Sequence, residues 1–457
     1  MKTINKRILL LTAVISIFTI VTGVLLGSLL LNADDYALKS VNKHIYENNV
    51  LTNAGDIVDT NGKILATTID GNRIYNDNEN IRKALLHIIG DNKGFIAGGI
   101  QDTFKNELSG YNIVYGISKS SGNTLTLTLD SDLCAYAYEQ LQPYSGTIAV
   151  CNYKTGELVC IATSPSYDMY NKPADIDDNK KYDGVYINRL YGGLYTPGSI
   201  FKIVTAMSAI ENIDDIFTRT FTCNGSYTMS DGGKIICNDN HGTITFEQAL
   251  NRSCNVAFSI IANELGWDKL NNAFTIAGLA NSHKSPDRIT SYKGIFGATA
   301  ESSATEIGWT GIGQSTTLIN PYNFLTFMCA IANGGTCNEP YFVKSVTTDS
   351  GRSIYQAKPV DSGININTTT AATLKKILRS TVSSYYGDYR FGNLEICGKT
   401  GTAEQDNANP HAWFAGFSAD EEFPYAVIAV LENSGKGLTY AGTAASNVLQ
   451  KLYKTIT

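Results

Sequence analysis

Residues 8–31 form one uninterrupted apolar run, ILLLTAVISIFTIVTGVLLGSLLL, which contains no charged side chain. A helix rises about 1.5 Å per residue, so a helix of this length crosses a bilayer core of roughly 30 Å with some tilt to spare. Three basic residues precede the run and two aspartates follow it, an asymmetry that the positive-inside rule associates with a cytoplasmic N-terminus. We therefore predict a cytoplasmic tail at residues 1–7, a single transmembrane anchor at residues 8–31, and an extracytoplasmic location for the rest of the chain.

The alternative to an anchor is a cleaved signal peptide, which also begins with basic residues and continues into an apolar run. The run here is longer than the usual apolar region of a signal peptide. In addition, the sequence LNA at residues 31–33 matches poorly to the small-x-small pattern at which such peptides are cleaved. We expect the segment to be retained.

The length and charge of the chain restrict its partners. At 457 residues it exceeds one typical domain, so two soluble domains are expected after the anchor. The 36 lysines and arginines against 42 aspartates and glutamates give a net charge of −6, and no basic block is present. Because nucleic-acid binding depends on basic side chains that neutralise phosphates, we do not expect nucleic acid as a partner.

The nine cysteines are dispersed, odd in number and without a C-x-x-C pair, so they do not form a recognisable disulfide framework. Most of them are expected to be buried core thiols. Cys223, Cys237 and His241 were considered as metal ligands, but the spacing C-x13-C-x3-H matches no common zinc pattern. We therefore predict no metal site, with a Cys223–Cys237 disulfide as the alternative if the compartment is oxidising.

Turn and periodicity signals divide the region after the anchor into two domains. Residues 33–125 alternate short strand-like runs with turns, among them a hairpin around Asn61-Gly62 and a helical stretch at residues 78–90 that ends at a glycine. We predict a small N-terminal pedestal domain there, resembling a dimerisation domain, and a catalytic domain at residues 126–457.

The predicted catalytic domain has hairpins at its two extremes and helices between them. A strand, a helix beginning near Asp130 and a hairpin at residues 146–163 open it. Strands at 394–404, 411–417 and 423–431 and a helix at 440–453 close it, and residues 244–266 and 316–335 have helical periodicity. This order indicates an α+β fold, in which one antiparallel sheet built from both ends of the domain is flanked by helices.

The stretch YTPGSIFKIVTA, residues 195–206, places a serine and a lysine three residues apart. We predict Thr196 as the N-cap of a helix and Pro197 as its first residue, both favoured there. Ser199 and Lys202 then lie on one face, about one turn apart. A serine hydroxyl becomes a nucleophile when a neighbouring base removes its proton, and an amine is such a base only where its pKa is lowered.

Two further short motifs complete a set: S-x-N at Ser253-Cys254-Asn255 and K-T-G at residues 399–401. Each pattern alone is weak, because copies also occur at residues 40–43, 121–123 and 154–156. Those copies lie in a polar juxtamembrane segment, in a loop and in a hairpin turn, so we interpret them as structural accidents. In the set that contains Ser199, the first motif opens a helix, the second interrupts a helical segment and the third lies in a late strand.

With these three motifs, the chain resembles the class B penicillin-binding proteins, within the superfamily that also contains the serine β-lactamases. The likeness covers nearly the whole chain: the N-terminal anchor, DIVDTNGKILATT in the pedestal, GELVCIATSPSYD before the predicted nucleophile, NRSCNVAF around the second motif, GIGQ at residues 311–314 and HAWFAGF after the third. The resemblance implies a penicillin-binding transpeptidase fold, a bacterial cell membrane and an extracytoplasmic catalytic domain.

The catalytic roles expected for these residues are those of acyl transfer. Ser199 would attack the substrate carbonyl, and Lys202 would take its proton because burial and the second cation, Lys399, disfavour its charged form. Ser253 would relay a proton to the leaving group. Asn255 would hold Lys202 and the substrate amide in place.

Substrate binding is assigned to the strand that contains the third motif. Thr400 and Thr402, with Lys399 nearby, suit a terminal carboxylate, and Gly401 allows close approach of the backbone. Trp413 is a further candidate for substrate contact, with an ordinary core position as the alternative. The resemblance places the oxyanion hole at the backbone N–H groups of Ser199 and Thr402.

The resemblance implies a peptidoglycan D,D-transpeptidase that needs no cofactor, cross-links stem peptides ending in D-Ala-D-Ala, and is acylated by β-lactams. It also implies partnership with a SEDS-family glycosyltransferase. The alternatives are a serine β-lactamase, a β-lactam sensor, and a catalytically inert membrane scaffold. GNLEICGKT has the wrong glycine spacing for a phosphate-binding loop, and neither His241 nor His411 lies in a recognisable Ser-His-Asp motif.

Overall fold

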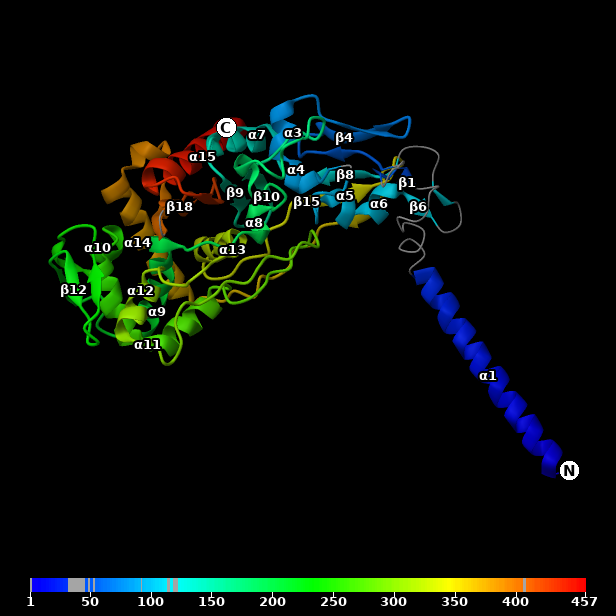
Figure 1. Cartoon of the computed structure of the whole chain (residues 1–457), viewed down its shortest axis with the longest axis horizontal. Coiled ribbons are helices and arrows are strands. Elements are labelled where there is room, and N and C mark those ends of the chain that lie inside the picture. The colour runs from blue at the N-terminus through cyan, green and yellow to red at the C-terminus, as the bar shows by residue number, and fades with distance from the viewer. Residues whose placement is uncertain are drawn as a thin grey trace.

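The computed structural model describes residues 2–31, 46–47, 50–51, 54–91, 93–112, 116–117, 122–405 and 408–457. Helix α1 (Lys2–Leu31) lies apart from the rest of the protein in Figure 1. Its apolar stretch Ile4–Leu29 is the single helix of the described residues that is long and apolar enough to cross a membrane, and none of it is buried by the rest of the chain.

A five-stranded antiparallel sheet forms the centre of the larger part of the protein. Its strand order is β10-β9-β19-β18-β17, where the strands are β9 (Gly146–Asn152), β10 (Leu158–Ser164), β17 (Ile396–Gln405), β18 (Ala408–Ser418) and β19 (Tyr425–Leu431). Strand β9 pairs along its whole length with β19. The predicted α+β fold, with one sheet made from the two ends of the domain, is therefore confirmed, and β17 lies at the edge of this sheet.

Helices flank this sheet. Helix α13 (Pro321–Ala332) is buried at every residue and packs against β18, β19 and β9. Helices α7 (Ser131–Leu141) and α15 (Thr443–Ile456) contact each other as well as the sheet. As predicted, Asp130 is the N-cap of α7, and its side chain accepts a hydrogen bond from the Leu133 N–H.

A second, mixed sheet of six strands has the order β16-β15-β8-β3-β4-β5. It contains the predicted hairpin, with β3 (Ile57–Val58) antiparallel to β4 (Ile64–Ile69), together with β5 (Asn72–Tyr75) and β8 (Thr124–Leu127). Two strands of the later chain, β15 (Val343–Thr347) and β16 (Ser353–Gln356), extend it through β8. The domain boundary near residue 125 stays a prediction, because this sheet draws strands from both sides of it.

The remaining elements lie between these sheets and at the two ends of the body (Figure 1). The predicted helical stretch at 78–90 consists of two short helices that end at Gly90. The other elements of the described residues are β1 (Tyr46–Glu47), β2 (Val50–Leu51), α3 (Glu79–Ala84), α4 (Leu86–Ile89), α5 (Ile100–Thr103), α6 (Lys105–Ser109), β6 (Tyr111–Asn112), β7 (Gly116–Ile117), η1 (Lys180–Tyr182), α8 (Arg189–Gly192), η2 (Gly198–Phe201), α9 (Lys202–Asn212), β11 (Thr220–Cys223), β12 (Ser226–Thr228), β13 (Lys234–Ile236), β14 (Gly242–Thr245), α10 (Phe246–Asn251), α11 (Asn255–Ile276), α12 (Ala304–Gly311), α14 (Thr368–Thr381), η3 (Val382–Tyr386), η4 (Asp388–Phe391) and η5 (Leu438–Gly442).

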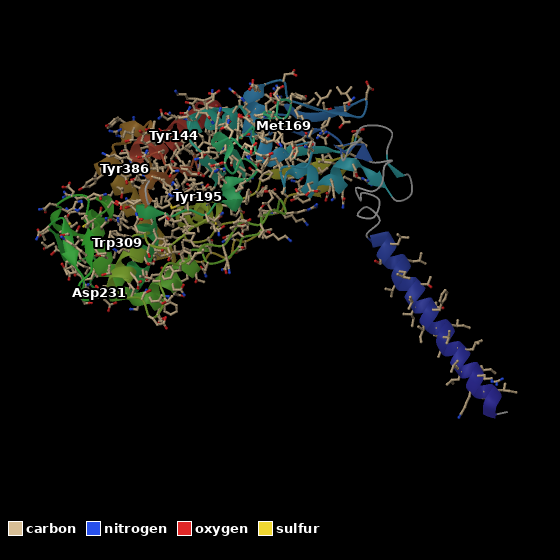
Figure 2. All side chains as sticks on the ribbon, viewed as in Figure 1. Tyr144, Met169, Tyr195, Asp231, Trp309 and Tyr386 are labelled. Carbon is tan, nitrogen blue, oxygen red and sulfur yellow. The ribbon has the colours of Figure 1, made fainter. Side chains whose placement is uncertain are left out.

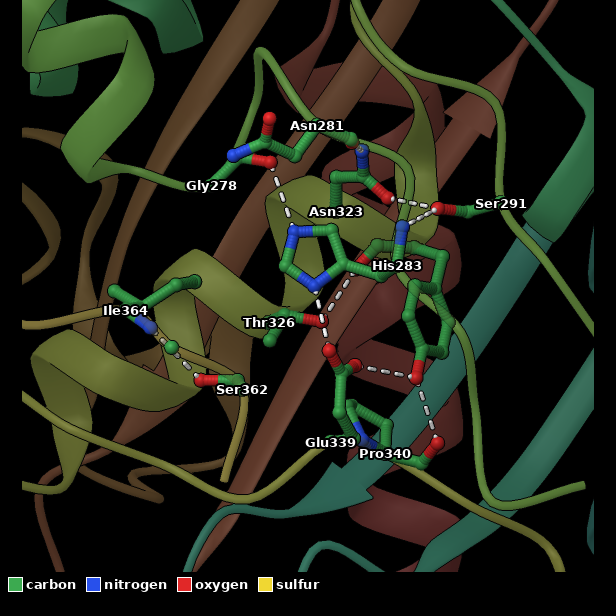
Figure 3. Close-up of polar contacts among 12 residues, drawn as sticks. Gly278, Asn281, His283, Ser291, Asn323, Thr326, Glu339, Pro340, Ser362 and Ile364 are labelled. Carbon is green, nitrogen blue, oxygen red and sulfur yellow. Dashed lines mark hydrogen bonds and ion pairs between the residues drawn. The ribbon is translucent and has the colours of Figure 1, made fainter. Parts of the chain in front are cut away.

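A buried polar network joins helix α13 to the loops on either side of it (Figure 3). His283 lies 2.7 Å from a Glu339 carboxylate oxygen through Nδ1 and 2.8 Å from the Gly278 carbonyl through Nε2. The Tyr322 hydroxyl donates to the other Glu339 oxygen at 2.9 Å. Burial opposes the imidazolium, but the hydrogen bond and charge of Glu339 raise the pKa of His283 above its usual value of 6.5. The network fixes the loop that follows α11 against the central helix.

An ion pair joins helix α3, in the N-terminal region of the chain, to the loop that follows β10. Arg82 in α3 donates from Nε and Nη2 to the two carboxylate oxygens of Asp168, at 2.7 Å each. The two side chains are only 10% and 4% exposed. Removing one member of a buried pair leaves the other charge without compensation, which is strongly destabilising.

We expect Arg82→Met to lower the free energy of unfolding by about 3 to 5 kcal/mol, because Asp168 then stays buried without its partner. Urea unfolding of the full chain in detergent, followed by tryptophan fluorescence, measures this change. Lys83→Met is the matched control, since its pair with Glu79 is largely exposed and is expected to contribute at most about 1 kcal/mol. Equal effects of the two substitutions would show that the Arg82 pair does not hold the two regions together.

Candidate active site

The Ser199 segment begins as a 3-10 turn. Helix η2 (Gly198–Phe201) continues directly into α9, and the residue before it is Pro197, in a helical conformation and without a side-chain cap. The predicted N-cap at Thr196 is therefore wrong. The Thr196 carbonyl instead accepts a hydrogen bond from the Trp413 indole N–H at 3.0 Å, which ties the segment to strand β18.

Gly198 has a backbone φ of +56°, a conformation that residues other than glycine rarely adopt. A Cβ atom placed on it would lie 2.7 Å from the Thr402 carbonyl oxygen. The chain just before Ser199 thus packs directly against strand β17. Ser199 itself stays partly exposed, although its neighbours Gly198 and Ile200 are buried.

Lys202 joins the first two motifs. Its Nζ lies 2.8 Å from Ser199 Oγ, 2.8 Å from Asn255 Oδ1, 3.2 Å from Ser253 Oγ and 3.1 Å from the Ser253 carbonyl oxygen. The side chain is completely buried. One amine therefore contacts Ser199 of its own motif and both polar side chains of the second motif.

Among the described residues, no carboxylate hydrogen-bonds to this amine or pairs with its charge. Burial and, next, the charge of Lys399 lower the pKa of Lys202 from 10.5 to about 7. An amine with this pKa is partly neutral at neutral pH, and its free electron pair then accepts a proton from a hydroxyl 2.8 Å away.

The second motif lies where the predicted helical segment breaks into α10 and α11. Ser253 has φ of +57°, which is unusual for a residue other than glycine and turns its hydroxyl and its carbonyl toward Lys202. Cys254 is the N-cap of α11, and its sulfur accepts the Ala257 N–H. Asn255, the first residue of α11, donates from Nδ2 to the Ile236 carbonyl at 2.9 Å, which orients its amide toward Lys202.

The third motif lies in β17, and it brings Tyr386, which the sequence analysis missed, into the site. Lys399 Nζ donates to the Thr400 carbonyl at 3.2 Å and to the Tyr386 hydroxyl at 3.5 Å. The same hydroxyl lies 2.9 Å from Thr400 Oγ1 and accepts the Thr400 N–H at 3.2 Å. Burial lowers the pKa of Lys399 to about 7. Tyr386, which is labelled in Figure 2, thus contacts both groups predicted to bind a carboxylate.

The other residues predicted for substrate binding differ in their exposure. Thr402 is partly exposed, and its Oγ1 accepts the Gly437 N–H at 3.2 Å. Gly401 is buried, and a Cβ on it would lie 2.6 Å from the Pro197 carbonyl oxygen, so it allows β17 to approach the Ser199 segment. Trp413 is fully buried. This is the ordinary core position given above as the alternative to substrate contact, and the indole N–H holds the Thr196 carbonyl.

Neither histidine that the sequence analysis weighed as a base contacts Ser199. His411 Nδ1 accepts the Asn433 N–H at 3.0 Å, and burial lowers its pKa. The turn at Lys154-Thr155-Gly156 is an ordinary hairpin turn, in which the Asn152 side chain accepts two backbone N–H groups. The copies at residues 40–43 and at Ser121 lie outside the described residues.

All nine cysteines are free and buried, so the predicted core thiols are confirmed and the alternative Cys223–Cys237 disulfide is not formed. The spacing argument against a metal site considered only Cys223, Cys237 and His241. In the structure Cys254 joins these three residues in one cluster, whose four ligand atoms lie within 4.8 Å of one another. The signal missed in the sequence was the full spacing C-x13-C-x3-H-x12-C, whose last member lies inside the second motif.

Comparison with known proteins places this geometry in a family. Residues 146–454, more than half of the chain, match the family described as the penicillin binding protein transpeptidase domain. The Peptidoglycan D,D-transpeptidase PbpA of Mycolicibacterium smegmatis is 25% identical over 348 residues, which cover 71% of this chain and 70% of that protein. Stage V sporulation protein D of Bacillus subtilis is 25% identical over 351 residues, which cover 73% of this chain and 53% of that protein.

Solved structures of penicillin-binding proteins also superpose on this chain. The D,D-transpeptidase domain of a peptidoglycan glycosyltransferase from Eggerthella lenta superposes with a TM-score of 0.75 at 26% identity, covering 88% of this chain and 99% of that one. Penicillin-binding protein A from M. tuberculosis, solved as a ceftriaxone acyl-enzyme complex, gives a TM-score of 0.77 at 19% identity, covering 88% of this chain and 98% of its own. At 19% identity the second likeness concerns the fold alone.

Proposed function

The chain belongs to the penicillin-binding protein transpeptidase family, and from this premise we propose that it is a peptidoglycan D,D-transpeptidase that acts through an acyl-Ser199 intermediate. The observation that carries the proposal is the buried Lys202 amine, which contacts Ser199, Ser253 and Asn255 at once. A base, a nucleophile and a proton relay are thereby assembled before any substrate binds.

In the proposed acylation step, neutral Lys202 takes the Ser199 proton while Ser199 Oγ attacks the carbonyl carbon between two D-alanines. The backbone N–H groups of Ser199 and Thr402 stabilise the resulting oxyanion, and each such donor contributes about 3 to 4 kcal/mol. The proton then passes from Lys202 through Ser253 to the departing amine, the carbon–nitrogen bond breaks, and D-alanine leaves. The peptide remains as an ester on Ser199.

The second step reverses the proton movement. The amine of a neighbouring stem peptide attacks the ester carbonyl, and a new peptide bond forms as the bond from that carbonyl to Ser199 Oγ breaks. The proton of the amine returns through Ser253 and Lys202 to the departing Ser199 Oγ. No cofactor enters either step. A β-lactam carries a reactive amide in place of the D-Ala-D-Ala bond, so the same attack leaves a stable acyl-enzyme.

Strand β17 is proposed to bind the donor peptide. As an edge strand it lies where an extended chain could add to the sheet. Lys399, Thr400 and Thr402 then meet the terminal carboxylate, with Tyr386 holding Thr400 and Lys399 in position. A cation beside two hydroxyls suits this charge.

The proposal also covers location and partners. Helix α1 anchors the chain in the bacterial cell membrane with its N-terminus in the cytoplasm, which leaves the catalytic domain beside the cell wall. Because a transpeptidase needs glycan strands made by another activity, a SEDS-family glycosyltransferase is the proposed membrane partner, by analogy with class B relatives.

Labelling of the full chain in detergent with a fluorescent penicillin tests the function. We expect about one label per chain and only slow loss of it. Among the described residues, no aspartate or glutamate is a hydrogen-bond partner of Ser199, Lys202, Ser253 or Asn255 to activate a deacylating water. Rapid release with turnover of the drug would identify a β-lactamase instead, and absence of labelling would support the inert scaffold.

A further inference from the structure

The cluster of Cys223, Cys237, His241 and Cys254 lies beside the active site but has no role in acyl transfer. Its members come from four places in the chain: the end of β11, the residue after β13, the loop before β14, and the N-cap of α11. The three cysteines are buried and the histidine is partly exposed. Two small two-stranded sheets, β11-β14 and β12-β13, are therefore joined to the helix that carries Asn255.

The distances within the cluster are those of a tetrahedral ligand set. With metal–sulfur bonds of about 2.3 Å and metal–nitrogen bonds of about 2.0 Å, two sulfurs of a zinc tetrahedron lie about 3.8 Å apart and a sulfur and a nitrogen about 3.5 Å apart. Here Cys237 Sγ lies 3.9 Å from Cys254 Sγ and 3.5 Å from His241 Nδ1. All four ligand atoms lie within 4.8 Å of one another.

Backbone N–H groups at the start of α11 point at two of the sulfurs. The Asn255 N–H donates to Cys237 Sγ at 3.3 Å, and the Ala257 N–H donates to Cys254 Sγ at 3.4 Å. Both donors belong to the first turn of α11, where the helix dipole stabilises negative charge. Donors of this kind orient the ligands of metal sites. Elsewhere among the described residues, no group of three or more possible ligands comes together.

We propose that Cys223, Cys237, His241 and Cys254 bind one structural Zn²⁺ ion. Three thiolates and one imidazole around a closed tetrahedron are the donor set of structural zinc sites, and no oxygen donor completes a site for Mg²⁺ or Ca²⁺. The three thiols lose their protons to solvent on binding. With all four positions filled by protein, the metal has no place for substrate.

The position of the site gives the metal a structural task. Cys254 separates Ser253 from Asn255, and Asn255 also donates to the Ile236 carbonyl next to Cys237. Fixing Cys254 and Cys237 on one ion therefore fixes the backbone that points Ser253 and Asn255 at Lys202. This positioning effect rests on the proposed function, whereas metal binding itself does not.

The test measures zinc in the full chain purified in detergent without chelator, by inductively coupled plasma mass spectrometry. We expect about one zinc per chain. Cys223→Ser and His241→Ala are expected to weaken zinc binding by more than the roughly 10- to 100-fold that loss of an outer-shell partner costs. Cys337→Ser is the matched control, because Cys337 is equally buried but lies outside the cluster, and it should keep its zinc.

Replacement of zinc by Co²⁺ keeps the test independent of folding defects in the variants. The unaltered chain should show a thiolate-to-cobalt charge-transfer band and the intense visible bands of tetrahedral cobalt. A titration of thiols in the denatured chain with chelator should find all nine. Absence of zinc and of the cobalt bands, or two thiols fewer because Cys237 and Cys254 are joined as a disulfide, would overturn the proposal.

Penicillin labelling separates this proposal from the function. If the chelated, zinc-free chain loses labelling and regains it with Zn²⁺, the ion positions the second motif. If labelling persists at the same rate after the zinc is removed, the positioning effect is excluded while the metal site stands. If the zinc-loaded chain is never labelled, the proposed function fails although the metal site holds.

Discussion

Lys202→Met is expected to slow acylation of Ser199 by penicillin about 10²- to 10⁴-fold, the contribution usual for a positioned general base. Lys202 is the group within hydrogen-bond distance of Ser199 Oγ that can take its proton, at 2.8 Å. Methionine has a similar length and no charge, so it fills the buried space without the cost of burying an amine. The second-order rate constant for labelling of the full chain measures the effect.

The pH profile distinguishes a base from a merely structural amine. Because the pKa of Lys202 is about 7 and only its neutral form takes a proton, acylation of the unaltered chain should accelerate as pH rises through about 7. Lys399 has a pKa of about 7 as well. In the proposed mechanism its cation binds the drug carboxylate, so the rate should fall again at higher pH, and the two groups should titrate as a coupled pair.

In Lys202→Met the rising part of this profile should disappear while the falling part remains. Lys376→Met on the exposed surface of α14 is the control for loss of a lysine, and it should match the unaltered chain at every pH. A Lys202→Met chain that is labelled within tenfold of the normal rate, with the rising part intact, would remove Lys202 from the role of base.

Short-range patterns were sufficient to predict most of the fold. The hairpin at Asn61-Gly62, the helix capped by Asp130 and the strands at both ends of the catalytic domain depend on turn residues and apolar periodicity, which act between near neighbours. The way β15 and β16 join the sheet of the N-terminal region depends on contacts between distant segments. No local pattern carries that information.

For the candidate active site, too, local patterns were predictable and contacts between distant segments were not. The motifs identified Ser199, Lys202, Ser253, Asn255 and Lys399, and the structure brings the first four together around one amine. The failed prediction concerns tertiary packing. Thr196 does not cap its helix, and its carbonyl instead accepts a hydrogen bond from the buried Trp413 on a distant strand.

Two missed groups had little signal in the sequence. Tyr386 ends a π-helical turn and reaches Lys399 and Thr400 across the fold, 13 and 14 residues away along the chain. Cys254 was read only as the middle of the S-x-N motif. Its inclusion with Cys223, Cys237 and His241 required knowing that two small two-stranded sheets fold onto the start of α11.

Gly198→Ala should slow acylation by about 10²- to 10³-fold, the cost of losing one oxyanion donor. The added Cβ would lie 2.7 Å from the Thr402 carbonyl oxygen and 3.0 Å from the Ala403 Cα. Backbone atoms cannot rotate away as a flexible side chain does, so the Ser199 segment and β17 must separate. The Ser199 and Thr402 N–H groups would then no longer point at the same oxygen.

Gly334→Ala separates this steric effect from backbone strain. Gly334 has φ of +81°, and a Cβ on it would meet nothing within 4 Å. Both substitutions incur the conformational cost of an alanine at positive φ, which is about 1 kcal/mol or more, so both should lower the temperature of unfolding. Only Gly198→Ala should slow penicillin labelling, since only there does the methyl group push the nucleophile away from the strand. Equal labelling rates in the two variants would mean that the close approach of Gly198 to Thr402 does not form the oxyanion hole.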